Sequence, residues 1–172
     1  MPGIDPESER PAADASPPLA SSPDDWSILI VDDNPAALAT LRTLMLVLGL
    51  EPPLEAAGGV EAQELVRSND LDCIITDLRM EPMSGLEFVR WLRHSNEAGN
   101  RTARILTVSA YRDAAEIAAA CKDGANGFLA KPVSVASLRA ALAALAEHPD
   151  AFVEVEQTSG RVRLKASPAA AR

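Results

Sequence analysis

Reactive side chains follow several short apolar segments of this sequence, and Asp77 is the most telling of them. Asp77 ends the apolar segment 71–76 and is followed by a loop that contains Pro82 and Gly85. A run of this length, bounded by turn residues, predicts a strand that is buried on both faces. The carboxyl ends of parallel strands border the crevice in which open α/β sheets bind ligands. We therefore predict that Asp77 is a nucleophile that accepts a phosphoryl group.

Two more acids, Asp32 and Asp33, follow the apolar segment 27–31. Three carboxylates that lie close together need a cation, because like charges at short range oppose ionisation. Oxygen ligands in an open arrangement suit Mg²⁺, which also bridges protein carboxylates to a phosphate. We predict that Asp33 and Asp77 bind Mg²⁺ directly, that Arg79 contributes its main-chain carbonyl, and that Asp32 acts through water.

A hydroxyl and an ammonium group stand at two further strand ends. Ser109 follows the predicted strand 104–108, and Lys131 follows the predicted strand 126–130. A phosphoryl group on Asp77 would carry negative charge that Mg²⁺, an ammonium and a hydroxyl donor can stabilise. A serine at a strand end is often only a cap, and a lysine before a proline is often only part of a turn. The prediction therefore depends on their combination with the acids.

The elements that must position these side chains alternate along residues 25–148. Short apolar segments at 27–31, 50–55, 71–76, 104–108 and 126–130 are separated or followed by helical patterns at 35–48, 60–67, 86–93, 113–122 and 134–147. Such alternation predicts an α/β fold with a parallel sheet covered on both faces. Five strands of this length match the flavodoxin-like, doubly wound order 2-1-3-4-5. This order makes the strands before Asp33 and Asp77 neighbours, so the acids share one cleft.

Both ends of the chain differ from this pattern. Residues 1–24 are rich in proline, alanine, serine and acids without apolar periodicity, which predicts a disordered tail. In the C-terminal extension 149–172, alternating segments flank Ser159-Gly160 and predict a β-hairpin over 152–165.

A two-residue turn in this hairpin would place Glu156 opposite Arg163 and Glu154 opposite Lys165. An isolated hairpin is marginal in water, so its apolar face would have to cover the domain, a second copy or a partner. The alternative is a frayed tail with chance alternation.

Composition restricts the partners and the compartment. The formal net charge of −9 disfavours non-specific binding to nucleic acid or to an anionic membrane. No apolar run is long enough to span a membrane, and the N-terminal residues lack a secretion signal. Cys73 and Cys121 lack metal-ligand spacing and are expected to be free thiols in a reducing compartment. We expect a cytoplasmic protein with no nucleic-acid or membrane partner.

Over about residues 26–148 the chain resembles the response-regulator receiver domains of bacterial two-component signalling. The motifs that carry the resemblance are Ile30-Val31-Asp32-Asp33-Asn34, Asp77-Leu78-Arg79-Met80 with Pro82-Met83-Ser84-Gly85, Val108-Ser109-Ala110 and Phe128-Leu129-Ala130-Lys131-Pro132. The resemblance implies that a histidine kinase or a histidine phosphotransfer protein phosphorylates Asp77 with Mg²⁺. It also implies that Ser109 moves toward the phosphoryl group while Phe128 rotates inward, and that the Lys131–Pro132 bond is cis. Glu81 departs from the family pattern by intervening before Pro82.

The pattern of residues 149–172 does not predict a DNA-binding or catalytic output domain. We therefore expect a stand-alone response regulator that signals through protein contacts on the face formed by residues 113–147, as a monomer or a homodimer. It would not be an enzyme beyond Mg²⁺-dependent self-phosphorylation and slow autodephosphorylation. One alternative is a non-switching interaction or dimerisation module on the same fold. Another is a magnesium-dependent phosphatase, which would need an acid at the position of Arg79.

Overall fold

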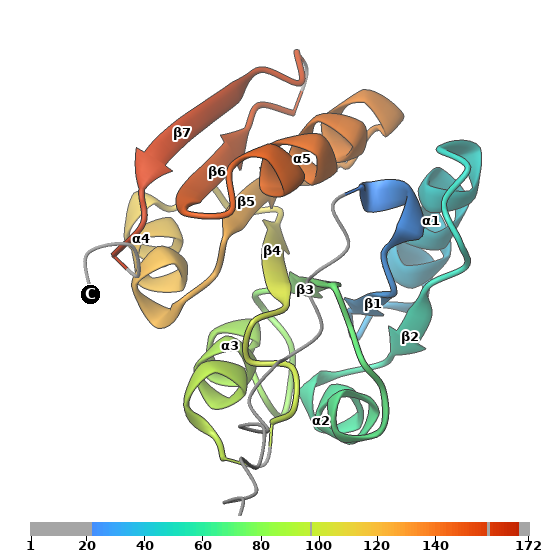
Figure 1. Ribbon diagram of the computed structural model, residues 1–172, viewed down its shortest axis with the longest axis vertical. Helices are drawn as coiled ribbons and strands as arrows, with labels where there is room; N and C mark the ends of the chain where they lie inside the picture. Colours follow the sequence, from blue (N-terminus) through green and yellow to red (C-terminus); the bar gives the residue numbers. More distant parts are fainter. Residues whose placement is uncertain (1–21, 97, 158, 169–172) are drawn as a thin grey trace, which may run out of the picture.

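The computed structural model describes residues 22–96, 98–157 and 159–168. Its strands are β1 (Ile28–Val31), β2 (Leu54–Ala56), β3 (Cys73–Asp77), β4 (Arg104–Ser109), β5 (Gly127–Ala130), β6 (Ala151–Val155) and β7 (Val162–Ala166). Its helices are η1 (Pro23–Asp25, a 3-10 helix), α1 (Pro35–Val47), α2 (Gly59–Ser68), α3 (Gly85–His94), α4 (Ala114–Asp123) and α5 (Val135–Glu147). The strands form one sheet in the order β2-β1-β3-β4-β5-β6-β7 (Figure 1).

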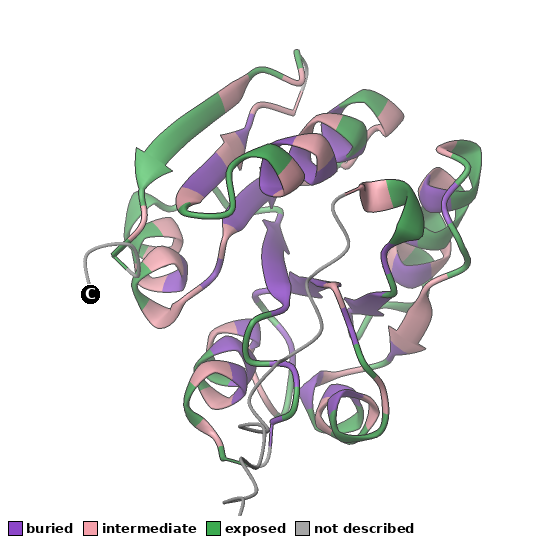
Figure 2. Cartoon of the chain, in the orientation of Figure 1, coloured by how far each residue is buried: buried purple, intermediate pink, exposed green. Residues whose placement is uncertain are grey.

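The first five strands confirm the predicted parallel order 2-1-3-4-5. Strands β1, β3, β4 and β5 are buried along their whole length, because helices cover both faces of the sheet (Figure 2). Strand β2 is shorter than the predicted segment 50–55. Pro52 and Pro53 cannot donate ladder hydrogen bonds, so β2 begins only at Leu54, on the sheet edge.

The helices divide into two layers. Helices α1 and α5 cover one face, where residues such as Leu41 and Leu142 pack against the strands. Helices α2, α3 and α4 cover the other face, which holds Phe88 and Phe128 (Figure 1). None of the helices among the described residues is both long and apolar enough to cross a membrane.

Two helix starts shape the loops beside the strand ends. Asn34 caps α1, its side-chain oxygen accepting a hydrogen bond from the Ala36 backbone, and Pro35 takes the first helical position. Ser84 and Glu87 form a capping box at the start of α3. A β-carbon at Gly85 would overlap the Asp77 carbonyl oxygen, so only glycine lets α3 begin this close to the end of β3.

The predicted C-terminal hairpin is confirmed, and it covers its own domain. Strand β6 pairs in parallel with β5, and β7 pairs antiparallel with β6. Phe152, Val153 and Val155 are all buried, whereas β7 is largely exposed at the outer edge of the sheet (Figure 2). The frayed-tail alternative is therefore wrong, and β5 is an inner strand rather than the edge.

The register of the hairpin differs from the prediction. Glu154, not Glu156, lies opposite Arg163. The connection is longer than a two-residue turn: the Glu156 N–H donates to the Arg161 carbonyl oxygen, and Gly160 takes a positive φ of 63°. The predicted ion pairs still form, but on the diagonal. Arg163 contacts Glu156 at 2.6 Å, and Lys165 contacts Glu154.

The structure does not describe the two ends of the chain. The predicted disordered tail 1–24 falls mostly on residues 1–21, which lie outside the described residues, as do 169–172. The described part of that tail, residues 22–24, includes the first two residues of η1.

Candidate functional site

The three predicted acids meet at the carboxyl ends of β1 and β3, which are neighbours in the sheet. Asp32, Asp33 and Asp77 each offer one carboxylate oxygen, and these oxygens lie within 4.8 Å of one another. Asp32 and Asp77 are buried, whereas Asp33 is exposed. An oxygen-only set that is open on one side suits Mg²⁺, which keeps several waters when it binds. The residues present therefore fit the predicted metal.

Backbone N–H groups of the adjoining loops orient these carboxylates. The Asn34 N–H donates to Asp32 Oδ1 at 2.9 Å, and the Arg79 N–H donates to Asp77 Oδ2 at 3.1 Å. The Glu81 N–H lies 3.4 Å from Asp33 Oδ2. One carboxylate oxygen of each acid is therefore held in place by a backbone N–H group.

Lys131 bridges two of the acids. Its Nζ lies 2.7 Å from Asp32 Oδ2 and 3.0 Å from Asp77 Oδ1. It follows β5, and the Lys131–Pro132 peptide bond is cis, as the resemblance implied. The Glu81–Pro82 bond is also cis, which the sequence did not indicate. The predicted lysine is therefore in direct contact with the predicted nucleophile.

Burial and charge act in opposite directions on this pair. Burial raises the pKa of Asp77, and the hydrogen bond and charge of Lys131 offset this only in part. Burial alone would lower the pKa of Lys131, but its hydrogen bonds and charge interactions with Asp32 and Asp77 outweigh burial and raise it. Lys131 is therefore a cation at neutral pH.

The two predicted switch residues lie on the neighbouring strands β4 and β5, and both are buried. Ser109 ends β4, one residue beyond the partner of Asp77 in the ladder, and it is buried. Its Oγ accepts a hydrogen bond from the Tyr111 N–H at 3.1 Å. Phe128 on β5 is only 3% exposed and belongs to the core on the α2–α4 face. Phe128 already points inward in this structure.

Comparison with known proteins identifies the same family as the sequence motifs did. The family model of the response regulator receiver domain matches residues 28–143. The chain belongs to this family. Chemotaxis protein CheY-3 of Vibrio cholerae is 30% identical over 112 residues, which cover 65% of this chain and 85% of that protein. Chemotaxis protein CheY1 of Helicobacter pylori is 34% identical over 106 residues, which cover 61% and 84%.

A solved response regulator from Burkholderia pseudomallei has the same fold, with a TM-score of 0.62 and 32% identity. The match covers 73% of this chain and 71% of that one, whose structure is described with a phosphorylated aspartic acid, a calcium ion and citrate.

The sequence did not indicate that Glu116 on α4 lies beside the receiver site. The guanidinium carbon of Arg79 lies 3.7 Å from the centre of the Tyr111 ring. Arg79 Nε also lies 3.4 Å from Oε1 of Glu116, on α4. The sequence resemblance implied that Arg79 and Tyr111 tune dephosphorylation, without a direction of effect, but it indicated no contact between them and assigned Glu116 no role. The only signal at Glu116 was an acid in the first turn of a helix, which is common because it complements the helix dipole.

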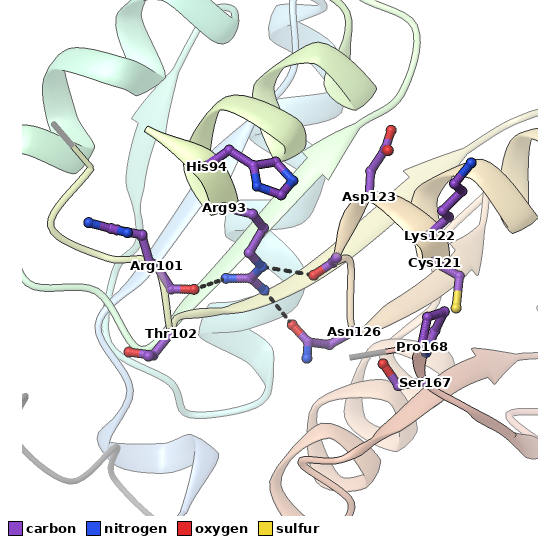
Figure 3. A pocket seen from close by; sticks show the side chains of 11 residues that line it. Arg93, His94, Arg101, Thr102, Cys121, Lys122, Asp123, Asn126, Ser167 and Pro168 are labelled. Atoms are coloured by element: carbon purple, nitrogen blue, oxygen red, sulfur yellow. Dashed lines mark hydrogen bonds between the residues drawn. The ribbon is translucent and has the colours of Figure 1, made fainter. Parts of the chain in front are cut away.

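A pocket of about 410 Å³ lies at the end of the receiver domain opposite to the acids, beside the amino ends of β4 and β5 (Figure 3). Its central group is Arg93, which donates to the Gly124 carbonyl and Asn126 Oδ1, both at 2.9 Å, and to the Arg101 carbonyl. Burial lowers the pKa of Arg93 to about 10, so it remains a cation at neutral pH. These contacts tie α3 to the segments before β4 and β5, which is a structural role.

Proposed function

We propose that the protein is a single-domain response regulator that accepts a phosphoryl group on Asp77 and signals through protein contacts. The contact of Asp77 with Lys131, beside the exposed carboxylate of Asp33, carries this proposal. It combines a nucleophile, a fixed cation and a metal-binding carboxylate in one crevice. The Burkholderia pseudomallei relative, with its phosphorylated aspartic acid and bound calcium ion, supports the same role.

The proposed reaction is transfer from a phosphohistidine of a histidine kinase or phosphotransfer protein. A carboxylate oxygen of Asp77 forms a bond to phosphorus while the bond from phosphorus to the donor's imidazole nitrogen breaks. The imidazole retains the electron pair and takes up a proton. Asp33, Asp77 and the Arg79 carbonyl would hold Mg²⁺ directly and Asp32 through water. When bound, this ion supplies positive charge that favours transfer.

The chain's own residues stabilise the product. Lys131 already contacts an Asp77 oxygen, and in the phosphorylated protein its ammonium group pairs with a phosphoryl oxygen. Ser109 donates its hydroxyl hydrogen to another phosphoryl oxygen after movement of the β4–α4 loop. Phe128 is already buried before phosphorylation, so the inward rotation implied by the resemblance needs no further burial of its ring. The product is a stoichiometric acyl phosphate that hydrolyses slowly, so the protein does not turn over a separate substrate.

A groove beside the site offers a surface to the donor. It has a volume of about 400 Å³ and runs from α1 to the segment after β5, where Lys131 forms part of its wall. Its other lining residues include Ala37, Leu41, Pro132 and Val133. A donor that packs small apolar side chains here would have its phosphohistidine close to Asp77.

The downstream contact is expected on the face formed by residues 113–147. Strand β6 covers the edge of β5, so the accessible parts of this face are the outer surfaces of α4 and α5, flanked by β7. The protein is expected to be cytoplasmic, and both a monomer and a homodimer agree with this role.

The proposal is tested by exposing the purified protein to acetyl phosphate or phosphoramidate with Mg²⁺ and measuring its intact mass. We expect one phosphoryl group per chain and no adduct in Asp77→Asn. The adduct should be unchanged in Asp150→Asn, which removes an exposed acid outside the cluster of three aspartates. Full labelling of Asp77→Asn would contradict the assignment. Failure of the wild-type protein to form an adduct or to bind beryllofluoride would favour a non-switching interaction module.

A further inference from the structure

The side chain of Arg79 connects the phosphorylation loop to α4. Its guanidinium carbon lies over the Tyr111 ring, at 3.7 Å from the ring centre, and its Nε lies 3.4 Å from Glu116 Oε1. The Arg79 N–H donates to Asp77 Oδ2, so the same residue touches the nucleophile through its backbone and α4 through its side chain. No other described residue makes both contacts.

Glu116 depends on this single contact. Its side chain is only 16% exposed, and its Oε2 is buried without a hydrogen-bond partner among the described residues. An incompletely paired carboxylate below the surface is unfavourable unless a cation stays close to it. If Arg79 moved away, Glu116 would have to turn toward water, and the first turn of α4 would lose its tie to the phosphorylation loop.

We propose that Arg79 is a positioning residue that fastens α4 through Glu116 in the unphosphorylated protein and transfers to the phosphoryl group once Asp77 is phosphorylated. The inference rests on the proposed function and adds a route by which this particular chain reports the phosphoryl group.

Charge and geometry favour the transfer. A phosphoryl group carries close to two negative charges and three acceptor oxygens, whereas Glu116 offers one charge at the long distance of 3.4 Å. Guanidinium groups bind phosphate oxygens with two parallel hydrogen bonds, which are stronger than a single long contact. Arg79 is two residues from Asp77, and its side chain is about half exposed, so it is free to turn.

The start of α4 adjoins the aromatic switch residue. Ile117, the residue after Glu116, lines a cavity of about 30 Å³ together with Phe128 and Val155. A displacement of the first turn of α4 therefore reaches the aromatic switch residue and the hairpin that covers it. Release of Arg79 would alter this contact even if Phe128 kept its inward position.

Tyr111 provides a direct probe, because it is the only tyrosine of the chain. Replacing it with 3-fluorotyrosine gives a single ¹⁹F resonance that senses the stacked guanidinium. We expect the resonance to move when acetyl phosphate and Mg²⁺ are added. In Glu116→Gln, which weakens the hold on Arg79, the resonance of the unphosphorylated protein should already be displaced toward the phosphorylated position.

Hydrogen exchange of the α4 amides separates a switch from a merely structural contact. We expect phosphorylation to speed exchange of residues 114–123 by roughly two- to fivefold, the range for loss of one partly exposed ion pair. In Glu116→Gln, exchange should be fast before phosphorylation and show no further increase. A merely structural contact would leave the phosphorylation-dependent increment intact in this variant.

The matched control is Asp123→Asn, which removes the ion pair between Arg90 of α3 and the other end of α4, 2.8 Å long. It should speed exchange in both states and retain the increment and the ¹⁹F response. Intact mass gives the phosphorylated fraction of every sample. A full wild-type adduct with an unchanged Tyr111 resonance and unchanged α4 exchange would overturn the Arg79 transfer alone. Absence of a wild-type adduct would overturn the proposed function, and the transfer with it.

Discussion

Gly127 of β5 lies directly opposite Val153 of β6, and a β-carbon at Gly127 would come within 2.9 Å of the Val153 carbonyl oxygen. It would also come within 3.2 Å of Leu106 Cδ1. The backbone of β6 therefore approaches β5 more closely than any side chain at this position would allow. A glycine at residue 127 suits this close docking of the hairpin, so the hairpin packs as part of the domain.

Gly127→Ala is expected to lower the free energy of unfolding by about 1–3 kcal/mol, the usual cost of forcing an extra methyl group into a packed core. Urea denaturation followed by circular dichroism measures this change. Gly99→Ala is the matched control, because no atom lies within 4 Å of a β-carbon there. Equal stability of the two variants would mean that β6 is not closely docked on β5 in solution.

Phe152→Ala tests the contribution of the hairpin to the core. Phe152 is fully buried in the α2–α4 layer, so its truncation should cost about 3–5 kcal/mol in the free energy of unfolding. Leu164→Ala, on the exposed β7, should change it by less than about 0.5 kcal/mol. Denaturant midpoints of both variants give the comparison. A midpoint for Phe152→Ala within error of the wild type would show that the hairpin is not integral to the fold.

The hairpin also shows what sequence patterns can and cannot predict here. Alternation correctly predicted two strands, because apolar and polar residues at every second position match the two-residue period of a strand. It could not choose among the domain, a second copy and a partner as the covering surface, since the edge of β5 has no sequence signature. The register was wrong because it was derived from a two-residue turn, whereas Gly160 closes a longer connection.

The site follows the same division. The sequence could predict that certain side chains lie close together, because strand order brings the ends of neighbouring strands to one rim of the sheet. These are Asp32, Asp33, Asp77 and Lys131. The contact between Arg79 and Glu116 could not be predicted, because it depends on how a loop and a helix pack rather than on spacing along either one. Patterns of apolar residues fix elements, but side-chain contacts between separate elements require the packed structure.

Lys131→Met should strengthen Mg²⁺ binding to the unphosphorylated protein. The Lys131 ammonium lies 2.7 Å from an Asp32 oxygen and 3.0 Å from an Asp77 oxygen, so it repels a cation that uses the same carboxylates. Removing one charge at such a range is worth on the order of 1 kcal/mol at the dielectric constant of water, so a gain of roughly fivefold in affinity is the least expected from these buried carboxylates. Calorimetric titration with MgCl₂ measures it.

The control for this prediction is Lys122→Met, which removes an exposed lysine of α4 and should leave the affinity unchanged. The Lys131 variant should also fail to retain a phosphoryl group from acetyl phosphate, because the product loses its fixed cation. Weaker Mg²⁺ binding by Lys131→Met would contradict the shared use of these carboxylates by the lysine and the metal.

Cys73 gives a prediction about pH. Burial raises the pKa of the Cys73 thiol from 9.0 to about 12. Between these values the folded protein keeps the thiol proton and the unfolded chain releases it, so the free energy of unfolding falls as pH rises. One such group can contribute a decrease of up to about 1.4 kcal/mol per pH unit. Below pH 9 the thiol is protonated in both states and contributes no slope.

Cys73→Ala isolates this contribution from those of other titrating groups. The variant is expected to be less stable than the wild type at pH 7 because it leaves a small cavity beside β1 and β4. Its disadvantage should shrink steadily as pH rises above about 9, since only the wild type carries the penalty of a buried thiol. Urea denaturation of both proteins between pH 7 and roughly 10.5 measures the difference. A constant difference across this range would mean that Cys73 gains access to water in the folded protein.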